Sequence, residues 1–485
     1  MRRTSIALPT LVWNALAVAM VLATAPTVEA KDKAPHGLPP AVRQALQRAD
    51  IKPQHAAFVV QPLSSLGKLS VSVNAHAAMN PASTMKLVTT YAALHRLGPA
   101  YTWSTEAFIN TAVQDGVLDG PLILRGSGDP KLVIENLWLL VQRIRALGIT
   151  HLKGNVLLDT SAFEQAQIDP GAFDGRHLRP YNAGPDALLV NFKAIIFRFV
   201  PDEQRGVAHV ITTPKLFGLT APSTIELSQG ACGAWREGLR ADFSNPMRPQ
   251  FKGRYPASCG ELIWPVSILT HTAYFEAVFR ELWTASGGRW DGHATGGSVD
   301  PLARRIVHHE SEPLAQIIRD INKFSNNVMA RQLLLTLATH NTSGDSTLPA
   351  TEARGARVVE DTLAELGLSF PELIIDNGAG LSRQAQISAH SLAALLQHAY
   401  ASAWMPELMS SLPIVGIDGT MKKRLGAVGQ AHIKTGLLSN VRAIAGYVLA
   451  QSGERYVVVA LINDRNAHLG QAAHDALLEW VYREG

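Results

Sequence analysis

Ser83-Thr84-Met85-Lys86 opens a stretch, from Pro81 to Leu97, whose apolar residues recur with helical spacing until Gly98-Pro99 ends it. Residues three apart at the start of a helix lie one turn apart on one face, so the Ser83 hydroxyl and the Lys86 ammonium are expected to meet. Burial near a helix N-terminus disfavours the charged form of a lysine. The pattern therefore predicts a serine nucleophile with Lys86 able to act as its base.

The same S-x-x-K spacing occurs a second time, at Ser65-Leu66-Gly67-Lys68. This copy falls in a predicted turn between two strands, residues 56–61 and 69–74, where no helix aligns the serine with the lysine. The pattern on its own is a weak signal, because an ordinary surface serine is the common alternative.

Lys434-Thr435-Gly436 is the only K-[ST]-G triplet in the chain, and it lies in an extended run over residues 431–438. A lysine and a hydroxyl on a strand edge can bind a substrate carboxylate, and glycine lets another backbone approach closely. The alternative is a turn with a solvated lysine.

Ser325-Asn326-Asn327 forms an S-x-N triplet between helical stretches. Its hydroxyl can relay a proton and the amide of Asn327 can hold a substrate carbonyl. The alternative for Ser325 is a helix cap. Ser72-Val73-Asn74 has the same form, but it precedes Ser83 and so stands in the wrong order for the set.

The three motifs occur in the order S-x-x-K, S-x-N, K-T-G, and in this combination the sequence resembles the penicilloyl-serine transferases. It is most similar to the class C low-molecular-mass penicillin-binding proteins, the D-alanyl-D-alanine carboxypeptidase/endopeptidase family. Four further segments look like that family: Gly126-Ser127-Gly128-Asp129-Pro130, Pro180-Tyr181-Asn182-Ala183 with Asn191, Gly378-Ala379-Gly380-Leu381-Ser382-Arg383, and Asp418-Gly419-Thr420. From the residues alone, Asp129 is only the cap of a turn.

The resemblance implies an α/β (α+β) fold: a β-lactamase/transpeptidase-like domain with an antiparallel sheet flanked by helices, interrupted by a β-rich insertion. We expect a signal peptide over residues 1–30, a catalytic domain split between residues 31–100 and 290–485, and an insertion over residues 101–289. The insertion is expected to hold an inner subdomain at about residues 192–262.

Residue patterns add individual elements to this outline. Helices are expected at 40–49, 273–286, 314–337, 351–366 and 469–482, and strands at 117–124, 155–158, 443–450 and 456–462. His308-His309-Glu310 is expected to be a solvated surface run and not a metal site.

The resemblance also implies a serine DD-peptidase that needs no metal and no organic cofactor. Its substrates would be peptidoglycan stem peptides, and β-lactam antibiotics would acylate the same serine. The implied roles are as follows: Ser83, Lys86, Ser325 and Lys434 are catalytic, Asn327, Thr435 and Gly436 bind substrate, and the Leu437 backbone N–H joins that of Ser83 in an oxyanion hole.

Two alternatives stay open. A β-lactamase of the same superfamily needs rapid deacylation, for example by the glutamate of an E-x-x-L-N segment, and the chain has no such segment. A catalytically silent wall-binding protein would have no need of all three motifs together.

The sequence departs from the family at two positions. Leu437 follows the K-T-G triplet where relatives often carry serine or threonine, so a side-chain hydroxyl is lost. Asn377 precedes Gly378 where relatives tend to carry an acid.

Composition places the chain among globular proteins: 485 residues, 47% hydrophobic and 17% charged. A formal charge of +4 is too small to indicate nucleic-acid binding. Arg2 and Arg3, an apolar stretch over 11–23 and Val28-Glu29-Ala30 predict a cleaved signal peptide and a periplasmic protein, with an uncleaved anchor as the alternative.

Cys232 and Cys259 are the only cysteines. In an exported chain they are expected to form a disulfide, and two isolated thiols are the alternative. Neither cysteine has histidines or further cysteines at metal-ligand spacing beside it.

Overall fold

The computed structural model describes residues 37–165, 168–340 and 348–485. The predicted signal peptide over residues 1–30 lies outside these ranges. Within them, no helix combines the length and the hydrophobicity that a membrane crossing requires.

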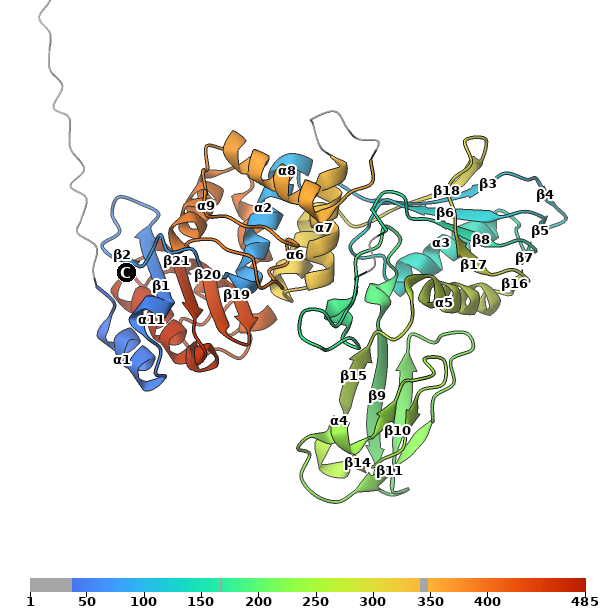
Figure 1. Ribbon diagram of the computed structural model, residues 1–485, viewed down its shortest axis with the longest axis horizontal. Helices are drawn as coiled ribbons and strands as arrows, with labels where there is room; N and C mark the ends of the chain where they lie inside the picture. The colour runs from blue at the N-terminus through green and yellow to red at the C-terminus, as the bar shows by residue number, and fades with distance from the viewer. Residues whose placement is uncertain (1–36, 166–167, 341–347) are drawn as a thin grey trace, which may run out of the picture. The chain divides into compact units, whose positions relative to one another are not determined.

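A five-stranded sheet joins the two ends of the described chain, in the order β19-β20-β21-β1-β2. All of its pairings are antiparallel, and β1 lies beside β21 from Ala56↔Ile462 to Pro62↔Tyr456 (Figure 1). The strands are β1 (Ala56–Pro62), β2 (Val71–Val73), β19 (Ala431–Leu438), β20 (Val441–Leu449) and β21 (Arg455–Asn463). Strand β19, which carries Lys434-Thr435-Gly436, is an edge strand of this sheet.

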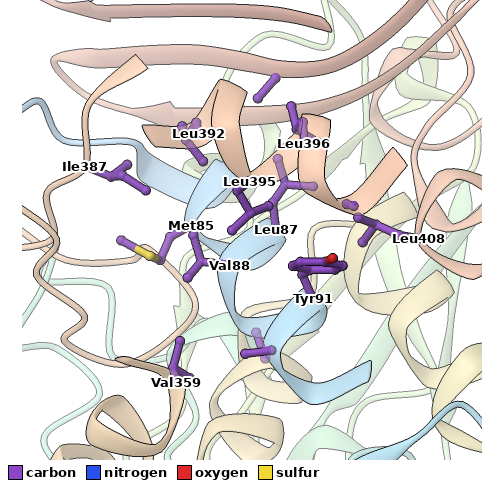
Figure 2. Close-up of a cluster of buried hydrophobic side chains, with 14 of the residues drawn as sticks. Met85, Leu87, Val88, Tyr91, Val359, Ile387, Leu392, Leu395, Leu396 and Leu408 are labelled. Atoms are coloured by element: carbon purple, nitrogen blue, oxygen red, sulfur yellow. The ribbon is translucent and has the colours of Figure 1, made fainter. Parts of the chain in front are cut away.

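Helices cover both faces of the sheet. One core contains residues of α1 (Pro40–Arg48) and α11 (Gln471–Glu484). The other core surrounds α2, whose Met85, Leu87, Val88 and Tyr91 contact apolar residues of the neighbouring helices (Figure 2). The helices on this side are α2 (Met85–Leu97), α6 (Leu314–Lys323), α7 (Asn327–Thr339), α8 (Glu352–Glu365), α9 (Ala389–Ala401) and α10 (Met405–Ser411).

Residues 104–310 form separate sheets. One has the order β17-β8-β6-β3-β18 and another the order β16-β7-β5-β4, and they pack with α3 (Ile134–Ala146) and α5 (His271–Ala285). Their strands are β3 (Ser104–Ile109), β4 (Val113–Gln114), β5 (Val117–Leu118), β6 (Leu122–Gly126), β7 (His151–Leu152), β8 (Val156–Asp159), β16 (Arg289–Trp290), β17 (Ala294–Gly296) and β18 (Arg304–Glu310).

A third sheet in this region has the order β14-β11-β10-β9-β15. Its strands are β9 (Ile195–Asp202), β10 (Val207–Thr213), β11 (Thr224–Ser228), β14 (Tyr255–Pro256) and β15 (Leu262–Val266), and α4 (Trp235–Gly238), β12 (Ala241–Asp242) and β13 (Gln250–Phe251) lie beside it in sequence. The expected disulfide is present, with the Cα atoms of Cys232 and Cys259 4.7 Å apart.

The structure confirms the fold class, a mixed α/β protein with an antiparallel sheet flanked by helices. The domain boundaries given above stay a prediction.

Several elements differ from the sequence expectation. The run over 117–124 is two strands, because Gly120-Pro121 interrupts it, and helix α3 was not foreseen in the region expected to be β-rich. The helical stretch over 314–337 is two helices, broken at Ser325.

Candidate active site

Ser83 lies in a single 3-10 turn, Ala82–Thr84, that leads directly into α2. Lys86 is fully buried, and its Nζ lies 2.8 Å from Ser83 Oγ. The same nitrogen donates to Asn327 Oδ1 at 2.7 Å and to the Ala379 carbonyl oxygen at 2.6 Å. A neutral amine has two N–H groups and one lone pair. In the charged form Nζ donates to Ser83 Oγ, whereas in the neutral form, with both N–H groups donated to Asn327 and Ala379, the lone pair can accept the hydrogen of Ser83.

The backbone around Ser83 is strained and closely packed. Ala82 has φ +46°, a left-handed conformation that alanine rarely adopts. Gly380 packs against the Ala82 carbonyl so closely that a side chain there would collide with it. Gly436 is equally constrained, since a Cβ would lie 2.6 Å from the Pro81 carbonyl oxygen. Glycine at 436 thus lets β19 approach the start of α2, as its place in the triplet predicts.

Ser325 lies between α6 and α7 with φ +56°, also in the left-handed region. The expected alternative, a capping role, belongs to its neighbour, since the Asn326 side chain accepts from Met329 N. The Ser325 hydroxyl instead accepts from Lys434 Nζ at 2.9 Å. The break between the two helices therefore presents Ser325 to Lys434 and Asn327 to Lys86.

The pKa values of both lysines are strongly lowered. Burial lowers the pKa of Lys434 to about 7. Burial first, and then the charge of Lys434, hold the pKa of Lys86 well below its usual range. An unpaired charge in a low-dielectric interior is costly, so the neutral amine of Lys86 is favoured. Perturbed groups of this kind gather at functional sites.

Beyond the triplet lysine, the Thr435 hydroxyl donates to the Thr420 hydroxyl at 2.8 Å. Leu437 leaves 60% of its surface exposed, although it is apolar. The three motifs thus come together at the edge of β19, and Leu437 lies at the end of the same strand.

Residues 38–483 match the D-Ala-D-Ala carboxypeptidase 3 (S13) family. The chain belongs to this family. It is 28% identical over 420 residues to a D-alanyl-D-alanine carboxypeptidase of Actinomadura sp. (strain R39), covering 81% of this chain and 74% of that protein. It is 25% identical over 395 residues to the D-alanyl-D-alanine carboxypeptidase DacB of Haemophilus influenzae, covering 80% of this chain and 81% of that protein. The crystal structure of penicillin binding protein 4 (dacB) from Haemophilus influenzae has the same fold, with a TM-score of 0.74 at 22% identity over 91% of this chain and 99% of that one.

In this S13 chain, a cavity of about 1310 Å³ opens over Ser83 and is lined by all three motifs. One wall comes from residues 173–181, where Asp174 accepts from Tyr181 and Asn182. Arg383 also lines the cavity, and its guanidinium lies 4.8 Å from the centroid of the Phe173 ring. The walls of the cavity therefore include many residues outside the three motifs.

Sequence reasoning gave no role to two groups that contact the motifs, the Ala379 carbonyl and the Thr420 hydroxyl. Both lie in segments that resemble the family, and this resemblance is the feature of the sequence that could have identified them. Asn377 holds the first segment in place, since its side chain donates to the Leu381 carbonyl oxygen and accepts from Ala379 N.

The structure also decides the weaker motifs. Ser65 lies in an exposed turn between β1 and β2, as expected. Asp129 caps its own turn by accepting from Lys131 N. The expectation for His308-His309-Glu310 was wrong for His309, which is buried because the alternating faces of β18 turn it inward. Within the described ranges, no three or more His, Cys, Asp or Glu side chains are arranged so that they could hold a metal ion.

Proposed function

We propose that this S13 family member is a serine DD-peptidase that hydrolyses D-alanyl peptide bonds of peptidoglycan through an acyl-enzyme on Ser83. The observation that carries the proposal is the hydrogen bonding of Lys86. Its two contacts with carbonyl oxygens leave the lone pair of a neutral amine for the Ser83 hydroxyl, 2.8 Å away. A serine hydroxyl becomes an effective nucleophile when a base takes its proton in this way.

In the acylation step, Lys86 takes the proton as Ser83 Oγ attacks the carbonyl carbon of the penultimate D-alanine. The tetrahedral oxyanion would be held by the backbone N–H groups of Ser83 and Leu437. Collapse breaks the C–N bond, and the leaving amine receives a proton through Ser325 and Lys434, which lie 2.9 Å apart. The ester that remains on Ser83 is then hydrolysed by water.

Substrate binding is assigned to groups around the same centre. Asn327 would hold the substrate amide, and Thr435 the carboxylate beyond the scissile bond. Gly436 provides the close approach of β19 to the start of α2.

β-Lactam antibiotics are proposed to acylate Ser83 as well. The Haemophilus penicillin binding protein 4 has been solved in complex with a β-lactam. The chain has no E-x-x-L-N glutamate to speed deacylation, so a long-lived adduct is expected and not rapid turnover. This outcome separates a peptidase from a β-lactamase, and the absence of any adduct would indicate a silent wall-binding protein.

We also propose that the protein works in the periplasm after removal of residues 1–30. The composition of that segment and the peptidoglycan substrate support this location. The domain division is likewise proposed: residues 31–100 and 290–485 would carry the chemistry, and residues 101–289, with the inner part at 192–262, would be inserted between the first two motifs.

The experiment that tests the function is a digest of isolated peptidoglycan with the products identified by mass spectrometry. Wild type should release D-alanine from pentapeptides or split cross-linked dimers, and Ser83→Ala should do neither. Unchanged muropeptides with wild type would contradict the proposal.

A further inference from the structure

A group of basic side chains lines the active-site cavity beyond Leu437. Lys423, Arg424, Arg442, His468 and His474 all border the same cavity as Ser83 and Thr435. They come from the segment after Thr420, from β20 and from the region of α11. None of the three sequence motifs includes them, so this basic pocket is separate from the groups assigned above.

Arg442 lies on β20, the strand that pairs with the K-T-G strand. It pairs with Leu437 across β19 and β20, and directly opposed residues point to the same face with Cβ atoms about 5 Å apart. Its Nε donates to the Ala467 carbonyl oxygen at 3.2 Å and its Nη1 to Gln471 Oε1 at 3.1 Å. These bonds fix the guanidinium, and within the described part of the chain Nη2 has no hydrogen-bond partner.

The pocket holds more positive charge than the nearby acids balance. The Asp475 carboxylate forms an ion pair with Arg424, contacting both Nε and Nη2 of the guanidinium. Among described residues, no carboxylate forms an ion pair with Arg442. Burial first, and then the charge of Arg424, lower the pKa of Arg442, while Asp475 acts in the opposite direction. An anion in this part of the cavity would relieve the imbalance.

A second unpartnered polar group of this pocket is His474. It is fully buried on α11, borders the cavity, and has no hydrogen-bond partner on either ring nitrogen in the described chain. Buried polar groups are almost always paired, with protein, water or ligand.

Strand β19, by contrast, offers few donors of its own to a carboxylate. The Thr435 hydroxyl shares a hydrogen bond with the Thr420 hydroxyl, and Leu437 has no hydroxyl. A carboxylate held by Thr435 therefore meets one neutral hydroxyl and no charged partner on this end of β19, whereas an arginine with an available N–H lies on the next strand.

We propose that Arg442, together with Thr435, binds the carboxylate of the residue that leaves in the reaction, and that Lys423 and Arg424 of the basic pocket add positive potential. This inference rests on the proposed function and deepens it, since it names the group that recognises the end of the substrate. Loss of a charge-assisted hydrogen bond of this kind is expected to weaken binding of the transition state about tenfold or more.

The test compares two pentapeptides that differ only at the C-terminus, one with the free carboxylate and one with a carboxamide. The quantity measured is the ratio of their kcat/KM values. In wild type the acid should be preferred, and in Arg442→Gln the preference should fall about tenfold because the acid alone loses rate. Arg442→Lys, which keeps the charge, should recover part of the preference.

The matched control is Arg465→Gln, which removes an exposed arginine that pairs with Asp50 and does not border this cavity. It should leave the ratio unchanged. Equal losses on both peptides in Arg442→Gln, with no recovery in Arg442→Lys, would show a structural role and overturn the inference. If wild type cleaves neither peptide and forms no penicillin adduct, the proposed function itself has failed, so the two failures are distinguishable.

Discussion

Lys86 and Lys434 are both fully buried, and burial first, then the charge of Lys434, lower the pKa of Lys86. Each lysine faces one serine, Ser83 and Ser325 respectively. Because two ammonium groups in one buried site repel each other, the pair favours a state in which Lys86 is neutral and any shared proton resides on Lys434. That state is the one that the proposed acylation of Ser83 requires.

The first prediction concerns the pH dependence of acylation. Acylation by penicillin should become faster as pH rises through the lowered pKa of Lys86, since the neutral amine is the base. In Lys434→Gln the neighbouring charge is gone, so the rising limb of the remaining activity should move to higher pH. The measurement is the second-order acylation rate between pH 5 and pH 10 for both proteins. A limb that stays in place or moves to lower pH would contradict the coupling.

The second prediction is that Lys434→Met stabilises the protein while it lowers peptidase activity strongly. Lowering the pKa of Lys434 from 10.5 to about 7 corresponds to roughly 4 kcal/mol of cost to the folded state at neutral pH. Methionine has a similar length and no charge to bury. Part of the gain is offset by the lost contact with Ser325, so we expect a rise of a few degrees in Tm at pH 7.

The sign of the pH effect provides the control for this prediction. Since the pKa of Lys434 is lowered on folding, the unfolded chain binds more protons between about pH 7 and pH 10.5, and wild-type stability rises across that window. The difference in Tm between variant and wild type should therefore shrink from pH 7 towards pH 10. A constant or growing difference would show that the burial of Lys434 is not its source.

The third prediction is that Leu437→Thr raises carboxypeptidase kcat/KM more than endopeptidase kcat/KM. A hydroxyl at this position can donate to the terminal carboxylate, a bond worth about 1.5–3 kcal/mol. In a cross-link, the group beyond the scissile bond belongs to a larger strand with other contacts, so cleavage depends less on that bond. Paired assays on a pentapeptide and a cross-linked dimer muropeptide check this. Equal changes on both substrates would exclude Leu437 as the source of a preference.

The fourth prediction concerns the disulfide. Cys232 and Cys259 are 27 residues apart, and their bridge constrains the unfolded chain by about 3.5 kcal/mol on the chain-entropy estimate. Both cysteines lie outside the catalytic motifs, so reduction should expose the chain near Cys232 to protease while peptidase activity persists. Limited proteolysis and an activity assay on the same reduced sample provide the comparison. Loss of activity before any new cleavage would contradict a local role.

The sequence was sufficient for those parts of the site that depend on local spacing. Ser83 and Lys86 meet because they lie one helical turn apart, and Lys434 and Thr435 lie on a strand that the extended run indicated. The Ala379 carbonyl could not be foreseen as a partner of Lys86, because 293 residues separate the two and only the tertiary fold brings them together.

Other differences also have physical causes. Helix α3 lies in a region of short β-branched runs, and its buried face packs against the core of that region, so tertiary contacts decide its conformation. The Thr420 hydroxyl reaches Thr435 through the path of a loop, which residue patterns do not specify. Arg442 and His474 carry no motif, and their relation to the cavity follows only from the pairing of β19 with β20 and the packing of α11.

The central claim is that Ser83 is the nucleophile, and the most direct measurement is the mass of the protein after incubation with benzylpenicillin, followed by peptide mapping. We predict one long-lived adduct, located on Ser83 in wild type and in Ser65→Ala, and none in a folded Ser83→Ala variant. An adduct that persists in Ser83→Ala, or that maps to another residue in wild type, would contradict the account.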